Sequence, residues 1–99
     1  MTSYRLTRLA RADLIDIWLY TEATWGEEQA DRYQDQLHDC CTGIAAGTAN
    51  ARSIPELNGV RYLHCQHHYL FFIEQDETVV IIAVLHERMD LLQRLKGRL

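Results

Sequence analysis

The polar and hydrophobic positions along the chain change period three times, and each change marks a different kind of element. After a short strand predicted at 3–6, hydrophobic side chains recur at the spacing of one helical face; they are Ala10, Leu14, Ile17, Trp18, Thr21 and Trp25. Thr7 has a side chain that can cap the first turn of this helix. A second helical stripe follows, formed by Ala30, Tyr33, Leu37, Cys40 and Ile44. The pattern predicts two amphipathic helices in succession, each with one buried face.

Glycines mark the ends of these two helices. Gly26 interrupts the first run, and Gly47 is typical of a helix end. Glu27 and Glu28 suit the positive first turn of the second helix. Because the break between the helices is short, we expect an antiparallel helical hairpin whose two apolar stripes need a hydrophobic surface to pack on.

The second half of the chain has the pattern of strands. Three apolar segments, 59–65, 68–74 and 78–85, are separated by short polar turns, which predicts an antiparallel meander. The last of them, TVVIIAVL, is apolar on both faces and therefore favours a central strand. A basic amphipathic helix follows, with Leu91, Leu92 and Leu95 on one side.

The predicted fold class is α+β. The element order is β-α-α-β-β-β with a short C-terminal helix, and the helical hairpin packs on a small, mainly antiparallel sheet. Ninety-nine residues suffice for one core and not for two, so we expect a single domain over 1–99. The longest apolar run, 79–85, is too short to cross a membrane, and the first residues lack the pattern of a secretory signal. We therefore expect a cytoplasmic protein without membrane contacts.

Charge is divided unevenly along the chain. From Asp13 to Asp39 there are eight acidic residues and one basic residue, whereas the last twelve residues carry four basic side chains and one acidic side chain. The hairpin should therefore present a negative surface and the C-terminal end a positive one. A net charge of −4 does not favour direct, sequence-specific binding of nucleic acid.

Cysteines and histidines are the other residues with possible chemistry. Cys40, Cys41 and Cys65 make no even disulfide framework, and we interpret all three as small buried hydrophobes. The segment HCQHH at 64–68 could be read as a metal site, but neighbouring residues of a hairpin face opposite ways. No matching carboxylate–histidine spacing occurs elsewhere in the chain. We therefore predict neither a metal site nor a cofactor.

Four segments resemble the ParE branch of the RelE/ParE toxin superfamily. In chain order they are YRLTRLARADL, IWLYTEATWGEEQADRY, GVRYL and VLHERMD. The resemblance implies the toxin of a bacterial type II toxin–antitoxin system, with a role in plasmid stabilisation. It also implies a protein inhibitor that poisons DNA gyrase and is not an enzyme. The implied partners are gyrase and a ParD-like antitoxin, the latter in a hetero-oligomer with the toxin.

RelE-like relatives instead cut messenger RNA on the ribosome, which is the alternative function. Cleavage through the 2′-hydroxyl needs a base, an acid and positive charge near the phosphate. The residues that could supply them are His86, Arg61 and Arg88, with Tyr69 as a further candidate. Arg61 is the one lysine or arginine within 59–85, whereas a groove for RNA would need several. The sequence therefore favours the inhibitor and no catalytic residues.

An inhibitor needs a surface that engages its partners. The candidates lie on the meander and at the corner before the C-terminal helix: Arg61, Tyr69, His86, Arg88, Met89, Asp90 and Arg94. The corner has an alternative, purely structural interpretation, in which Arg88 pairs with a nearby acid and Met89 packs beneath the turn. For Arg61 the alternative is an ion pair with Glu74 or Glu77. We expect the antitoxin to cover sheet edges and apolar patches that the hairpin leaves exposed.

Overall fold

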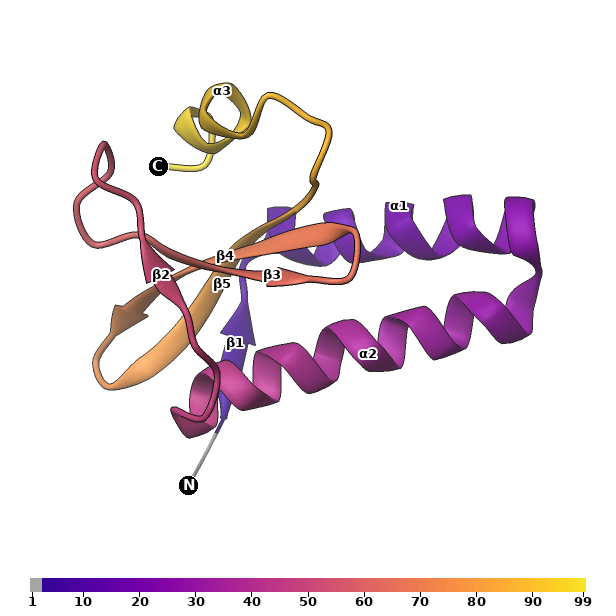
Figure 1. Ribbon diagram of the computed structural model, residues 1–99, viewed down its shortest axis with the longest axis horizontal. Coiled ribbons are helices and arrows are strands. Elements are labelled where there is room, and N and C mark those ends of the chain that lie inside the picture. The colour runs from indigo at the N-terminus through magenta and orange to yellow at the C-terminus, as the bar shows by residue number, and fades with distance from the viewer. Residues whose placement is uncertain (1–2) are drawn as a thin grey trace.

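The computed structural model describes residues 3–99 and confirms the α+β class (Figure 1). Its elements are β1 (Tyr4–Leu6), α1 (Arg8–Trp25), α2 (Glu27–Ala46), β2 (Arg52–Ser53), β3 (Arg61–Cys65), β4 (His68–Gln75), β5 (Thr78–His86) and α3 (Leu91–Lys96). Every predicted element is present, and β2 is an addition. Among residues 3–99, none of the helices combines the length and hydropathy that crossing a membrane requires.

The strands form one sheet in the order β1-β5-β4-β3-β2. The pairs β2–β3, β3–β4 and β4–β5 are antiparallel, as the meander requires. β1 instead pairs in parallel with β5, with Tyr4 opposite Val79 and Leu6 opposite Ile81. β5 therefore has a neighbouring strand on both sides, in agreement with its continuous apolar sequence.

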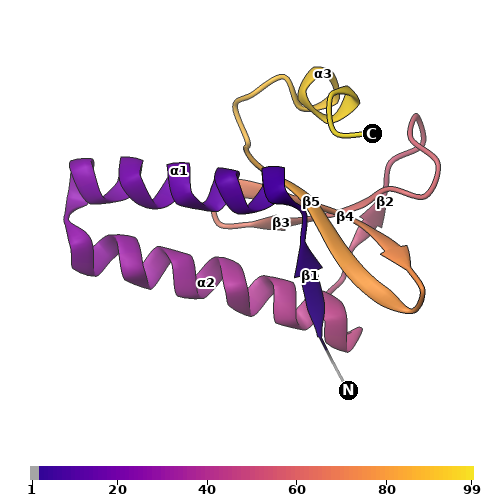
Figure 2. The same ribbon diagram turned by 180° about the vertical axis from the view of Figure 1, so that it is seen from behind.

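Local sequence explains where the hairpin helices begin and end. At the start of α1 the Thr7 hydroxyl accepts a hydrogen bond of 3.1 Å from the Ala10 backbone nitrogen, as predicted. Gly26 and Gly47 end α1 and α2 with φ values of 95° and 76°, a region of backbone space that favours glycine. The hairpin projects well past the sheet at its α1–α2 turn, as both views show (Figure 1, Figure 2).

The sheet has a hydrophobic layer on each face. The hairpin covers one face, where its buried residues cluster with Phe72 and Ile81 of the sheet. α3 and the segment 54–60 cover the other face, and Leu95 of α3 belongs to the same buried cluster as Phe71. α3 lies on the side of the sheet away from α2 (Figure 1). The C-terminal helix is therefore part of the core.

One predicted core position is wrong, and another is only partly buried. The stripe of α1 predicts a buried Trp25, but its side chain is 71% exposed because the hairpin turn extends past the sheet (Figure 2). Cys40 of the α2 stripe is partly buried against the core, whereas the neighbouring Cys41 is fully buried, with 1% of its surface exposed.

Cys40 forms a disulfide with Cys65, so the prediction of three unpaired cysteines is also wrong. The Cα atoms of the pair are 6.5 Å apart, within the usual range for a disulfide. The bond joins α2 to β3, which are 25 residues apart in sequence at this point. Cys41 remains a free thiol, and burial raises its pKa to about 12, which leaves it protonated and unreactive at neutral pH.

Candidate functional site

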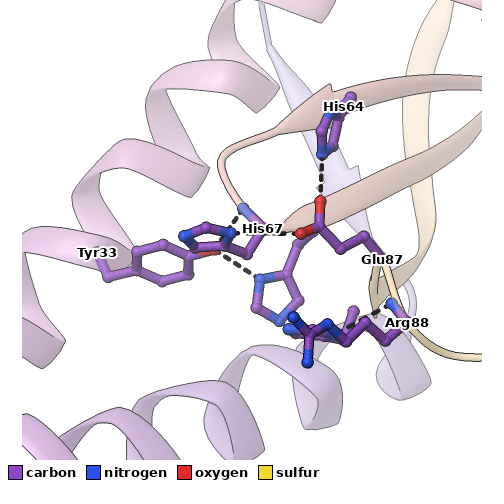
Figure 3. Close-up of polar contacts among 7 residues, drawn as sticks. Tyr33, His64, His67, Glu87 and Arg88 are labelled. Atoms are coloured by element: carbon purple, nitrogen blue, oxygen red, sulfur yellow. Dashed lines mark hydrogen bonds and ion pairs between the residues drawn. The ribbon is translucent and has the colours of Figure 1, made fainter.

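A polar cluster lies where the β3–β4 turn meets the end of β5 (Figure 3). Glu87 is at its centre, with one carboxylate oxygen 2.8 Å from His64 Nε2 and the other 3.4 Å from His67 Nδ1. The Glu87 backbone nitrogen also donates to the His67 carbonyl at 3.0 Å. Hydrogen bonds from His64 and then His67 hold the pKa of the Glu87 carboxyl below its usual value. These contacts fix the chain as it leaves β5.

His68 lies under this exposed layer and connects the sheet to α2. Its Nδ1 is 2.6 Å from the Tyr33 hydroxyl, which also accepts a hydrogen bond of 3.1 Å from the His67 backbone nitrogen. The Tyr33 hydroxyl thus contacts both the β3–β4 turn and the first residue of β4. Burial, and to a smaller extent the edge-on His86 ring, lowers the pKa of His68 to about 4. His68 is therefore a neutral structural residue at pH 7.

The neutral state of His68 makes the stability of the fold depend on pH. Its folded-state pKa of about 4 lies below the unfolded value of ~6.5, so the unfolded chain binds more protons between these values. The free energy of unfolding should be unaffected by His68 above pH 6.5 and should fall by about 3 kcal/mol as the pH is lowered to 4. Urea unfolding at pH 7, 5.5 and 4 measures this change. The variant His68→Gln should flatten the pH dependence; an unchanged slope in that variant would contradict the assignment.

Of the residues predicted for RNA cleavage, Arg88 lies beside His86, but Arg61 does not. Arg61 lies opposite Phe72, whereas His86 lies opposite His68. Phe72 and His68 are four residues apart on β4, about 13 Å at ~3.3 Å per residue. Arg61 is instead held above the Phe72 ring, 5.6 Å from its centroid, and pairs with Glu74 at 3.6 Å. The alternative of an ion pair with Glu74 is therefore confirmed.

The corner residues after β5 differ in what they contact. Arg88 is exposed, its backbone nitrogen donates to His86 Nδ1 at 3.1 Å, and no ion pair to it is found within residues 3–99. Met89 is 41% exposed rather than packed beneath the turn. Asp90 caps α3, where its side chain accepts a hydrogen bond of 3.3 Å from the Gln93 nitrogen. Arg88 and Met89 are thus available to a partner, while Asp90 has a structural role.

A groove of about 250 Å³ lies between α3 and the segment 53–56. Its floor is formed by Tyr62, Tyr69 and Phe71, whose ring centroids are between 5.7 and 6.2 Å apart. The leucines of α3 form one wall, and Glu56 is the one charged residue among the described residues that line it. An RNA groove would carry several cations. This groove instead suits an apolar side chain of a protein partner.

Sequence reasoning missed an exposed apolar face on α1. Leu9, Ile15, Leu19 and Tyr20 are 46, 54, 53 and 71% exposed. Ile15 and Leu19 are four residues apart and share one outward side of the helix. The signal was present, because α1 carries more large apolar residues than its inward stripe requires. An exposed apolar patch of this kind often marks a protein-binding surface.

Comparison with known proteins shows which family the chain belongs to. The family model described as "ParE toxin of type II toxin-antitoxin system, parDE" matches residues 4–91. The chain belongs to the ParE toxin family. A curated relative, Toxin ParE from Escherichia coli, is 42% identical over 100% of this chain and 98% of its own length. Toxin ParE1 from Caulobacter vibrioides is 38% identical, over 91% of this chain and 94% of its own. The family inferred from the four sequence segments is confirmed.

A solved structure shares the fold of this ParE toxin. It is described as the "Chromosomal ParDE TA system from P. aeruginosa", with a TM-score of 0.76 over 87% of this chain and 96% of that chain. The two sequences are 23% identical, so this comparison concerns the fold. The family match makes the chain the ParE toxin of a ParDE type II toxin–antitoxin system.

Proposed function

We propose that this ParE toxin is a non-enzymatic inhibitor of DNA gyrase that acts in the bacterial cytoplasm. The observation that supports it best is the character of the sheet face opposite the hairpin. That face presents an aromatic groove walled by leucines, with Glu56 as its one charged lining residue in the described chain. Arg61 and His86, which a nuclease would need together, lie at different ends of the strands. A surface of this kind acts by binding and not by hydrolysis.

The proposed gyrase surface consists of the exposed side chains of the C-terminal arm, defined as residues 87–99, together with the adjoining groove. Arg88, Met89, Leu92 and Arg94 are exposed on this arm, and Tyr69 reaches the groove floor. The arm is basic and partly apolar, whereas the hairpin is acidic. Charge complementarity then favours an acidic patch on gyrase as the region contacted.

A ParD-like antitoxin is proposed to cover the exposed face of α1. An amphipathic antitoxin segment would bury Ile15, Leu19 and their neighbours, whose exposure is otherwise unfavourable in water. This face belongs to the hairpin, whereas the arm lies across the sheet from α2 (Figure 1). The antitoxin and gyrase would thus meet different elements of the toxin, and a toxin–antitoxin hetero-oligomer would form through α1.

The experiment is a gyrase assay with purified toxin. The toxin should block supercoiling of relaxed plasmid DNA and raise the amount of cleaved gyrase–DNA complex. Met89→Asp, which places a negative charge on the exposed arm, should raise the half-inhibitory concentration at least ~10-fold, the effect of losing one important interface contact. Arg32→Gln is the matched control, because the ion pair that Arg32 makes with Glu28 on α2 is exposed.

Two results would count against this function. Normal gyrase turnover at saturating toxin would reject gyrase as the target. Codon-linked breaks in translated messages, detected by primer extension, would favour the RNA endonuclease instead.

A further inference from the structure

The least exposed ion pair within residues 3–99 joins Asp13 of α1 to Arg98, close to the C-terminus. The two side chains are 16% and 15% exposed. Arg98 Nη2 donates to Asp13 Oδ1 at 2.8 Å, and Arg98 Nη1 donates to Asp13 Oδ2 at 2.9 Å. This is the bidentate arrangement in which a guanidinium binds a carboxylate most specifically.

The pair also closes a part of the β5 edge that β1 does not reach. β1 pairs with β5 only at 79–81, and β5 continues beyond. There the Ile82 carbonyl accepts a hydrogen bond of 2.9 Å from Arg98 Nη1, and the Val84 nitrogen donates one of 2.9 Å to Asp13 Oδ2. The two side chains therefore take the place of main-chain partners from a neighbouring strand.

The same pair is the second anchor of the C-terminal arm. The first is Leu95, the buried residue of α3. α3 has six residues, and a helix of this length is not stable without tertiary contacts. Leu95 attaches the arm to the sheet face, and Arg98 attaches it to α1 around the edge of β5. Two anchors at separate points hold the arm in one orientation.

We infer that Asp13 and Arg98 form a latch that positions the C-terminal arm for its target. This inference rests on the proposed function. The leucines of α3 form one wall of the groove. If the arm were released, the groove would lose that wall, and the arm would have to be ordered again when the toxin binds its target. Asp13 and Arg98 are positioning residues, because they act through the orientation of the arm and not through contact with gyrase.

Two variants remove one charge each: Asp13→Asn, which keeps the size of the side chain, and Arg98→Gln, which shortens it. Each should require at least ~10-fold more toxin for half-inhibition of gyrase supercoiling. Hydrogen exchange at the amides of Leu91–Lys96 should become at least ~10-fold faster, with α2 and β4 unchanged. The double variant should be no worse than either single variant, because the two residues act as one unit.

Two further variants separate positioning from a general loss of stability. Arg98→Lys keeps the charge but loses the planar fork, so it should recover part of the inhibition that Arg98→Gln loses. Arg32→Gln removes an arginine from an exposed pair on α2 and should change neither readout.

The latch is overturned if exchange in α3 is unchanged in both charge-removal variants. It is also overturned if exchange rises but inhibition stays at the wild-type level, because release of the arm would then have no effect on gyrase inhibition. If the wild-type toxin itself does not inhibit gyrase, the proposed function fails, and the exchange measurement alone decides whether the pair holds the arm.

Discussion

Replacing Leu95 by alanine is expected to lower the free energy of unfolding by about 2–5 kcal/mol, the usual range for a fully buried leucine. Leu95 is 0% exposed and packs with Phe71 and Leu85 in the hydrophobic layer on the α3 face of the sheet. Truncation leaves a cavity and removes the main attachment of α3 to the sheet. Urea unfolding of Leu95→Ala beside the wild type at pH 7 measures the change.

Leu92→Ala is the matched control on the same helix. Leu92 is 40% exposed, so its truncation should cost less than ~1 kcal/mol of stability. Because Leu92 lines the groove, the same variant should weaken gyrase inhibition. Equal losses of stability for the two variants would show that Leu95 is not the residue that attaches α3.

Reduction of the Cys40–Cys65 disulfide is expected to lower the free energy of unfolding by about 3 kcal/mol. The bond links residues 25 positions apart, and a crosslink over a loop of this length restricts the unfolded chain by about that amount. For a domain of this size the melting temperature should fall by roughly 10–25 °C. Thermal unfolding with and without a phosphine reductant measures the shift.

Cysteine variants provide the controls for this measurement. The double variant Cys40→Ala/Cys65→Ala should melt at the same temperature with and without reductant, whereas Cys41→Ala should keep the reductant effect because Cys41 is a free thiol. Should the wild type without reductant melt like the double variant, the bond would not form in the purified protein. In a reducing cytoplasm disulfides rarely persist, so the reduced protein is the form relevant to the proposed function.

The element order was predictable because its signals are local. Helical and strand periods, the Thr7 cap and the glycines that end each helix depend on residues only a few positions apart. The same holds for the continuous apolar sequence of β5, which predicted its central place in the sheet. The family could also be inferred, because its segments follow the elements in order.

The candidate site was predictable only in part. The exposure of Arg88 and Met89 at the corner agrees with the prediction of a partner surface, although their contacts with a partner stay a proposal. The sequence left two roles open for Arg61, a contact with a partner or an ion pair with a nearby acid. Its ion pair with Glu74 depends on the register between β3 and β4. That register also separates Arg61 from His86. Such pairings cannot be read from spacing along one strand.

Sequence by itself determined every element except β2, together with the fold class, the charge division and the toxin family. The tertiary structure decided that Cys40 meets Cys65, that Trp25 stays exposed, and that Asp13 binds Arg98 across a separation of 85 residues. The physical reason is one of range. Periodicity and capping reflect neighbours on a single element, whereas these contacts depend on how far the hairpin overhangs the sheet and on where the C-terminal arm crosses the edge of β5.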